Sequence, residues 1–391
     1  MQYRNTKNGT DISILGFGCM RFPHKGNKID MEETEKEILS AIDQGINYFD
    51  TAYLYPGSEE TLGNILKRNN CRDKINIATK LPQYMVKNSA AIDKYFNEEL
   101  KRLQTDYVDF YLMHMIADLG RWKKLKEYGI EDWIAKKKGE GAIKNIGFSF
   151  HGDTDTFIEI LDAYDWDFCQ IQYNYLDEHT QAGRRGLEYA ASKGIPVIIM
   201  EPLRGGRLVK FMPDSAKSII NNYEIKRTPA EWAFRWLWNQ PGVTCVLSGM
   251  NSMDMLNENV AAASKVEIGE FSEADNTMIE QVKDEINRTL KVGCTGCGYC
   301  MPCPKSVDIP NTFACYNRMF TETKNNARMD YMMATSFKKD VSDYSKCVEC
   351  GKCEQHCPQH IEIRKELKVA GKELMPFHYR VIRKIARLFI V

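Results

Sequence analysis

Four polar residues in the first third of the chain have the side-chain types that an acid catalyst needs. They are Asp50, Tyr55, Lys80 and His114. A tyrosine alone is a weak acid, because its ordinary pKa is about 10. A neighbouring lysine ammonium is expected to lower that pKa, an aspartate would keep the lysine charged, and a neutral histidine would orient a carbonyl group. The set therefore indicates protonation of a substrate carbonyl while hydride reduces it.

A second set of candidate residues consists of cysteines. Of the 13 cysteines, nine lie between Cys294 and Cys357, and eight of these form two runs of four, each followed by a proline. The eight are Cys294, Cys297, Cys300, Cys303, Cys347, Cys350, Cys353 and Cys357. Zinc sites use two separated pairs of ligands, whereas tight runs of four cysteines are typical of 4Fe–4S clusters. The spacing predicts two 4Fe–4S clusters, with zinc as the alternative.

The elements that would position the polar set are visible as short apolar segments. Eight of them, rich in β-branched residues, are too short for typical helices and indicate buried strands. They cover residues 12–20, 47–51, 75–81, 108–114, 143–150, 168–173, 196–200 and 243–249. Amphipathic stretches of helix length lie between them, at 31–44, 88–103, 157–163, 186–193, 229–239 and 253–263. This alternation predicts an α/β fold, a (β/α)8 TIM barrel.

A doubly wound sheet is the alternative fold for such an alternation. It would usually carry a dinucleotide-binding fingerprint of three glycines after its first strand, and the run GFGCM at 16–20 lacks the third glycine. In a barrel, chemistry occurs at the C-terminal ends of the strands. Asp50, Lys80 and His114 close three successive expected strands, so we expect them to meet with Tyr55 at one rim.

The motif DTAxxYxGSE, which starts at Asp50 and contains Tyr55, resembles the catalytic motif of the aldo-keto reductases when it is followed by Lys80 and His114. The resemblance covers roughly residues 10–265. It implies a (β/α)8 barrel, a bound nicotinamide cofactor and a small carbonyl substrate. It also implies that the tyrosine is the general acid, that the lysine and aspartate tune it, and that the histidine orients the carbonyl.

The same resemblance implies a set of cofactor contacts. They are Gly18, Met20, Asp50, Ser149, Gln170, Met200, Pro202, Leu203, Gly205, Gly249, Asn251, Glu258 and Asn259. Within this set, Ser149 and Gln170 match the residues that bind the carboxamide, and the last two match an adenine-binding pair. Two features depart from the family. Met200 replaces an aromatic residue, and the segment 248–255 has no Lys or Arg for a 2′-phosphate. The choice between NADH and NADPH stays open, with NADPH disfavoured.

The second cysteine run resembles that of bacterial ferredoxins, in which the fourth cysteine ligates the other cluster. The resemblance implies that Cys357 joins the first three cysteines of the first run, and that Cys303 joins the first three of the second. The first run has two residues instead of three before Cys303, so its assignment stays open. Residues 304–346 are longer than the usual link and predict helices at 309–319 and 329–337.

These observations divide the chain into four expected parts: a barrel at 1–270, a connecting helix at 271–291, a mainly helical two-cluster domain at 292–375, and a C-terminal helix at 376–391. The last part carries four cations and no acid, at Arg380, Arg383, Lys384 and Arg387. Such a basic amphipathic helix packs on its own protein, or it contacts a membrane surface or an acidic electron-transfer partner.

Composition narrows the function classes. Lys plus Arg and Asp plus Glu are 53 each, so the formal net charge is zero, and nothing indicates nucleic-acid binding. The sequence has no run of 18 apolar residues and a polar start, from which we expect a cytoplasmic location.

Three functions fit these features. The first is an oxidoreductase that reduces an aldehyde or ketone with NADH or NADPH, with clusters that conduct electrons or stabilise the fold. Because hydride carries two electrons and each cluster takes one, a flavin- or ferredoxin-linked reductase that uses single electrons is the alternative. A non-catalytic iron–sulfur electron carrier is the third, and the intact polar set argues against it.

Overall fold

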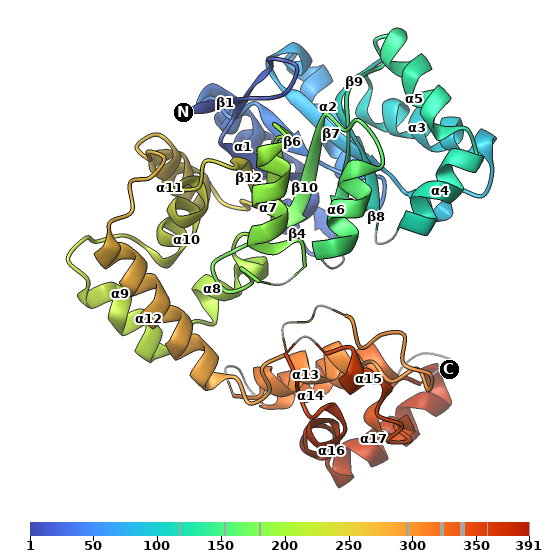
Figure 1. The fold of residues 1–391 in the computed structure, drawn as a ribbon, viewed down its shortest axis with the longest axis vertical. Helices are drawn as coiled ribbons and strands as arrows, with labels where there is room; N and C mark the ends of the chain where they lie inside the picture. The colour runs from blue at the N-terminus through green and yellow to red at the C-terminus, as the bar shows by residue number, and fades with distance from the viewer. Residues whose placement is uncertain are drawn as a thin grey trace. The chain divides into compact units, whose positions relative to one another are not determined.

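A computed structural model describes most of the chain (Figure 1). The described residues are 1–116, 119–151, 154–179, 181–294, 296, 298–320, 324–336, 341–357 and 359–390. By its internal contacts the chain divides into two units, Met1–Leu208 with Arg227–Glu273, and Val209–Lys226 with Ala274–Val391. The stretch 209–226 thus groups with the second unit, although it lies within the range expected to be barrel.

The first unit contains a closed barrel of eight parallel strands. These are β3 (Leu15–Gly18), β6 (Tyr48–Asp50), β7 (Asn76–Leu81), β8 (Val108–Ile116), β9 (Ile143–Phe150), β10 (Phe168–Gln172), β11 (Val197–Met200) and β12 (Val243–Ser248). Neighbouring strands pair in the closed order β10-β11-β12-β3-β6-β7-β8-β9. The predicted (β/α)8 barrel is confirmed, and each of its strands begins within one of the eight predicted segments, although β8 continues two residues past the predicted end at His114.

The predicted first strand, 12–20, is wrong as a single element. The chain instead forms an antiparallel pair, β1 (Tyr3–Asn5) with β2 (Asp11–Ser13), before β3 begins. At the break, the Ser13 hydroxyl donates to the carbonyl of Leu15 over 2.7 Å, and the Ser13 N–H donates to the Asn47 side chain over 2.8 Å. These side-chain bonds satisfy buried polar groups where the chain leaves one sheet for the other.

Helices surround the barrel. They are α1 (Met31–Asp43), α2 (Ser58–Arg68), α3 (Ser89–Leu103), α4 (Leu119–Glu127), α5 (Ile130–Gly139), α6 (Thr154–Asp162), α7 (Gly183–Ser192), α10 (Pro229–Trp238) and α11 (Met253–Ala263). The side chains of Asp30, Asn88, Thr228 and Ser252 accept backbone N–H bonds at the starts of α1, α3, α10 and α11. Such caps satisfy otherwise unpaired N–H groups, which explains where these helices begin.

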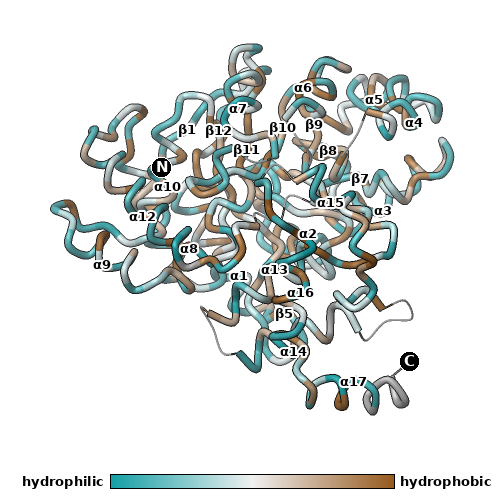
Figure 2. Tube along the Cα trace, turned by 60° about the horizontal axis from the view of Figure 1, so that its bottom comes forward, coloured by the Kyte–Doolittle hydropathy of each residue, from teal (hydrophilic) through white to brown (hydrophobic). Residues whose placement is uncertain are grey.

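Large aromatic side chains fill the inside of the barrel. The rings of Tyr48 and Phe110 pack edge to face at 5.0 Å between centroids, and Phe110 packs in the same way on Phe168 at 5.1 Å. Gly147 makes room for the last ring, because a Cβ there would lie 2.6 Å from it. This packed interior supports the rim without leaving a pore, and the strands are correspondingly hydrophobic in Figure 2.

The second unit is helical. It contains α9 (Asp214–Asn222), α12 (Glu273–Thr289), α13 (Ile309–Arg318), α14 (Lys324–Ser336), the short α15 (Lys352–Gln355), α16 (Ile363–Leu374) and α17 (Phe377–Ile390). Tyr223, next to α9, donates to Asp275 of α12 over 2.8 Å. Buried residues such as Phe313, Tyr331 and Leu367 form the apolar core of α13, α14 and α16.

The predicted helix at 309–319 is confirmed. The second predicted helix, 329–337, begins earlier, at Lys324, and Phe337 lies outside the described residues.

The C-terminal helix α17 forms as predicted and packs partly on its own unit. Tyr379 is buried, Arg380 donates to the Met375 carbonyl over 2.8 Å, and Arg383 pairs with buried Asp343. Phe377 and Ile382 are exposed on the same helix, whose alternating hydropathy is visible in Figure 2. Contact with a membrane or partner therefore stays a prediction. Of the helices that the structure describes, none has the length and apolar character needed to cross a membrane.

Candidate active site and cysteine-lined cavities

The centre of the predicted catalytic set is a buried ion pair. Lys80 lies on β7 and Asp50 ends β6, and Lys80 Nζ donates to Asp50 Oδ1 over 2.7 Å and to the Thr51 carbonyl over 2.6 Å. Burial would lower the pKa of Lys80, but the adjacent Asp50 carboxylate and Tyr55 together more than offset it, and the pKa is raised above its ordinary value. The lysine therefore carries its charge at neutral pH.

Tyr55 and His114 lie next to this ion pair. Tyr55 is in the loop between β6 and α2, and Lys80 Nζ lies 5.0 Å from the centroid of its ring. The His114 ring, near the end of β8, lies 6.1 Å from the tyrosine ring, with an angle of 88° between the planes. The structure thus brings together the four residues that the sequence singled out.

Arg102 holds the loop that carries Tyr55 in place. The guanidinium donates to the Tyr53 carbonyl and to Glu59, both over 3.2 Å, and lies 4.2 Å from the centre of the Tyr53 ring. Glu59 in turn accepts a bond from Thr79, the neighbour of Lys80, over 2.6 Å. These contacts connect the loop to the strand that bears the lysine.

The expected lowering of the tyrosine pKa is wrong in its net direction. Burial raises the pKa of Tyr55 above its ordinary value, and the attraction of Lys80 offsets this only in part, since Asp50 also acts against it. The phenol consequently keeps its proton through the neutral range. The sequence showed the lysine but not the degree of burial, which outweighs it.

His114 is neutral, as expected. Burial, with smaller contributions from nearby Lys80 and His151, lowers its pKa to about 3. Its Nδ1 is buried and has no hydrogen-bond partner among the described residues. An unpaired buried donor is rare in proteins. The tautomer with hydrogen on Nε2 therefore fits best, and it can donate to a carbonyl oxygen.

The expected carboxamide-binding residues lie on the neighbouring strands. Ser149 near the end of β9 accepts a bond from the Met115 N–H over 2.8 Å, and Gln170 on β10 donates to Asp50 over 3.3 Å. The carbonyl oxygen of the Gln170 side chain is buried and has no partner in the described part of the chain. A buried acceptor of this kind fits the amide N–H of a nicotinamide.

The other expected cofactor residues occupy the same end of the barrel or the helix that follows it. Gly18, Met200 and Gly249 end or follow β3, β11 and β12, and Pro202, Leu203 and Gly205 follow Met200. Met20 and Asn251 are exposed. On α11, buried Asn259 donates to Ser248 over 3.1 Å, whereas exposed Glu258 accepts from Thr228.

Arg21 is a candidate that the sequence analysis missed. Its Nη1 donates to the carbonyl of Gly205 over 3.2 Å, and its side chain passes close to Gly249. It thus joins two of the expected cofactor loops. The sequence analysis considered cations only at 248–255, whereas the signal was an arginine three residues after Gly18, which ends β3.

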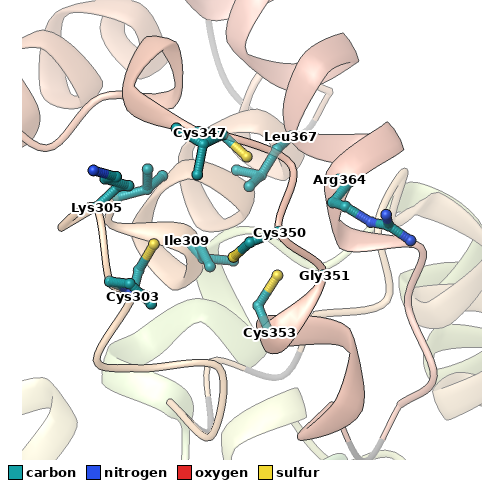
Figure 3. Close-up of a pocket in the computed structure, with 12 residues that line it drawn as sticks. Cys303, Lys305, Ile309, Cys347, Cys350, Gly351, Cys353, Arg364 and Leu367 are labelled. Atoms are coloured by element: carbon teal, nitrogen blue, oxygen red, sulfur yellow. The ribbon is translucent and has the colours of Figure 1, made fainter.

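Four of the predicted cluster ligands surround one cavity in the second unit. Cys303, Cys347, Cys350 and Cys353 line a space of about 350 Å³. Figure 3 shows their sulfur atoms turned toward a common centre. Three of these cysteines come from the second run and one from the first.

A second cavity, of about 310 Å³, is lined by three more of the predicted ligands, Cys294, Cys300 and Cys357. Cys297, the fourth cysteine expected there, lies outside the described residues. Both groups combine cysteines from the two runs. No disulfide occurs among the cysteines that the structure describes.

The two groups differ from sites for single metal ions. Within the described residues, no three Cys, His, Asp or Glu side chains converge closely enough to hold one ion. Four ligands spread around a cavity fit a cluster that has several metal atoms of its own, and tetrahedral zinc would require them closer together.

Comparison with known proteins agrees with both parts. Residues 14–284 match the aldo/keto reductase family, and residues 293–362 match a 4Fe-4S dicluster domain. L-galactose dehydrogenase of Arabidopsis thaliana is 27% identical over 66% of this chain and 86% of its own length. NADH-specific methylglyoxal reductase of Escherichia coli is 24% identical over 71% of this chain and 98% of its own.

Among solved structures, an aldo-keto reductase from Klebsiella pneumoniae in complex with NADPH has a TM-score of 0.59 at 23% identity, over 72% of this chain and 96% of that one. At this identity the likeness concerns the fold alone. The family matches, however, rest on sequence and together span both units. The chain belongs to the aldo-keto reductase family of oxidoreductases and carries a C-terminal 4Fe–4S dicluster domain.

Proposed function

We propose that the barrel reduces an aldehyde or ketone with a nicotinamide cofactor, with Tyr55 as the proton donor. The observation that carries the proposal is the buried pair of Lys80 and Asp50 next to the Tyr55 and His114 rings. A lysine held charged in a buried site stabilises the phenolate that forms when a tyrosine gives up its proton.

Each side chain of the site has a separate role in the proposed reaction. Nicotinamide, when bound, supplies the hydride. Gln170 offers an unpaired buried acceptor to the carboxamide, and Ser149 stands beside it on the adjacent strand. His114 donates from Nε2 to the carbonyl oxygen, and Tyr55 transfers its proton to the same oxygen as the bond to hydride forms.

Both nicotinamide cofactors remain candidates. The Escherichia coli relative is named as NADH-specific, and the Klebsiella pneumoniae protein was solved with NADPH. This chain lacks a cation at 248–255 but has Arg21 beside Gly205 and Gly249. We expect NADH to be accepted, and the ratio of kcat/KM for the two cofactors measures the preference. The names of these two proteins and of the Arabidopsis thaliana dehydrogenase mention no flavin.

The proposal is tested by Tyr55→Phe, with Tyr53→Phe in the same loop as matched control. Removing the proton donor should lower kcat for an aldehyde such as methylglyoxal by roughly 10²–10⁴-fold. Tyr53 contacts Arg102 through its ring and carbonyl, which phenylalanine preserves, so its variant should stay within about twofold. Equal activity of the two variants, with either cofactor, would remove Tyr55 from the reaction.

For the second unit, we propose two 4Fe–4S clusters with crossed ligands: Cys303 with Cys347, Cys350 and Cys353, and Cys357 with Cys294, Cys297 and Cys300. The grouping of seven of these cysteines around two cavities supports it. Anaerobically reconstituted protein should hold about eight iron atoms, and Cys303→Ser about four. Zinc with little iron would contradict the proposal.

A second candidate function is transfer of single electrons between the clusters and the barrel. It is favoured by the presence of two one-electron sites in a protein whose cofactor moves two electrons. The test is anaerobic: protein is mixed with NADH or NADPH, with and without carbonyl compound, while cluster absorbance is followed. If absorbance never changes during turnover, and Cys350→Ser keeps full activity, the clusters only stabilise the fold.

A further inference from the structure

The cavity lined by Cys303, Cys347, Cys350 and Cys353 opens among cations. Lys305 and Arg364 line it, and Figure 3 shows both side chains extending away from the cavity, to opposite sides. Cys350 is exposed, and Val348, which also lines the cavity, is 58% exposed. The mouth thus combines an accessible ligand, an apolar contact point and positive charge.

Most of this positive charge has no internal counterpart. Arg364 pairs with Glu354 and Lys368 with Glu349, which neutralises these two cations. Three further exposed lysines form no ion pair within the part of the chain that the structure describes; one lines the cavity, and the other two directly precede Cys347 and Cys353 in the sequence. They are Lys305, Lys346 and Lys352. We call these three lysines with Val348 the cationic rim.

The other cavity has a different lining. Its described residues are cysteines, small or apolar residues such as Pro310, Phe313 and Ile361, and one neutral polar residue, Gln359. Charge is therefore concentrated at one cluster site. The exposed cysteine and the charged lining residues thus belong to the same cavity.

We propose that the cationic rim is the docking surface for an acidic one-electron carrier protein, which exchanges one electron with the cluster behind Cys350. The proposal rests on the clusters of the proposed function. Complementary charge raises the rate of encounter between proteins, and electron-transfer complexes are small and transient, with little apolar contact needed. The electron that leaves the reduced carrier enters the cluster, so the carrier is oxidised as the cluster is reduced.

The test uses full-length, anaerobically reconstituted protein in which all three lysines are replaced, Lys305→Glu, Lys346→Glu and Lys352→Glu. Stopped-flow bleaching of the cluster absorbance is measured with two donors, reduced acidic ferredoxin and the methyl viologen radical cation. At low ionic strength the variant should react about tenfold or more slowly with ferredoxin. With the viologen cation its rate should be unchanged or faster.

The dependence of these rates on salt concentration provides a second test. Screening at high ionic strength should slow the reaction of the wild type with ferredoxin, because the effect comes from exposed charges. The rates of the wild type and of the rim variant should then become similar. The matched control replaces two exposed lysines that neither line a cavity nor neighbour a cluster cysteine in the sequence, Lys324→Glu and Lys372→Glu, and it should behave as the wild type with both donors.

The outcomes separate the two proposals. Normal iron content with an unchanged ferredoxin rate in the rim variant would overturn the docking surface and leave the clusters standing. Equal slowing with both donors would also overturn it, since a changed cluster would then be the cause. Reconstituted protein that holds no iron would contradict the proposed clusters themselves. Loss of binding to phosphatidylserine vesicles, with ferredoxin reactivity intact, would assign the rim to a membrane surface.

Discussion

In the barrel the candidate catalytic residues contact one another, whereas in the second unit the candidate ligands surround a space. Lys80 is bonded to Asp50 and Thr51 and is 1% exposed. Cys350 is exposed, and its three companions are partly exposed around a cavity of about 350 Å³. The barrel site is thus formed by protein contacts, and the cysteine sites are completed by what they bind.

The difference teaches how each site depends on its surroundings. A buried ion pair inside a closed barrel is held by packing and hydrogen bonds before any cofactor arrives. Ligands that face a cavity gain order when a metal group binds, so that binding contributes to folding. We therefore expect the two units to respond separately to changes that affect only one site.

Iron removal should produce the largest effect, and only in the second unit. Without the clusters, the loops that carry the cysteines lose the group that joins the two runs, and residues 292–375 should unfold at least locally. Hydrogen exchange followed by mass spectrometry should show rapid exchange there, while β7 and β8 stay protected. Unchanged protection around Cys347 would mean that the apolar core of Phe313, Tyr331 and Leu367 suffices by itself.

Lys80→Met should affect only the barrel. Removing one partner of a buried ion pair leaves Asp50 uncompensated, which costs about 3–5 kcal/mol. Calorimetry should show a less stable barrel, turnover should be lost, and the iron content should remain that of the wild type. Lys67→Met, on the exposed face of α2, is the control and should change stability by about 0.5 kcal/mol or less. A drop in iron content would show that the two sites are coupled.

The pH dependence of stability should reveal His114. Its pKa is about 3 when folded and 6.5 when exposed, so the folded state binds the proton less well. The stability that this group contributes is complete above pH 6.5 and decreases as the pH falls toward 3. Since one pKa unit is about 1.4 kcal/mol, the difference between 6.5 and about 3 corresponds to a loss of at most about 5 kcal/mol. His114→Gln should lose less stability than the wild type between these pH values; parallel curves would contradict the assignment.

Replacing Glu37 on α1 should have the smallest of these effects on stability. It tests the packing of the barrel separately from the candidate catalytic residues. The side chain is buried, and neither carboxylate oxygen has a hydrogen-bond partner among the described residues. Burial, with Glu33 nearby, raises its pKa from 4.5 to about 7. Its contribution is therefore complete below pH 4.5 and is lost as the pH rises through 7.

Glu37→Gln should consequently stabilise the protein by about 1–3 kcal/mol at pH 8 and have little effect at pH 4.5. Thermal melting at the two pH values measures this difference. Glu35→Gln is not a suitable control, because Glu35 pairs with Arg68; exposed Glu188, which has no ion pair in the described part of the chain, is suitable. A destabilised Glu37→Gln at pH 8 would indicate a partner that binds the carboxylate.

Much of this molecule was readable from local patterns. The eight strands follow from short apolar runs, because strands buried on both faces need them. The polar set at the strand ends followed from barrel geometry, and the structure brings it together. The two cysteine runs were visible from spacing, although their crossed pairing came from a resemblance and remains a proposal.

Other features depend on residues that are distant in the sequence. The break at Ser13 is set by Asn47, and Arg21 becomes a cofactor candidate only where it meets Gly205 and Gly249. The stretch 209–226 leaves its expected domain because α9 packs with α12. Pattern reasoning considers a window of neighbours, and none of these partners falls within one.

The sequence by itself therefore determined which chemical groups are present and which elements carry them, because side-chain type and hydrophobic period are local properties. Only the tertiary structure decided their state. Burial keeps His114 neutral and Tyr55 protonated, an adjacent carboxylate keeps Lys80 charged, and folding directs cysteines from two runs into the same cavities. The reason is that desolvation and charge–charge interaction depend on distances in space, which side chains acquire only when the chain has folded.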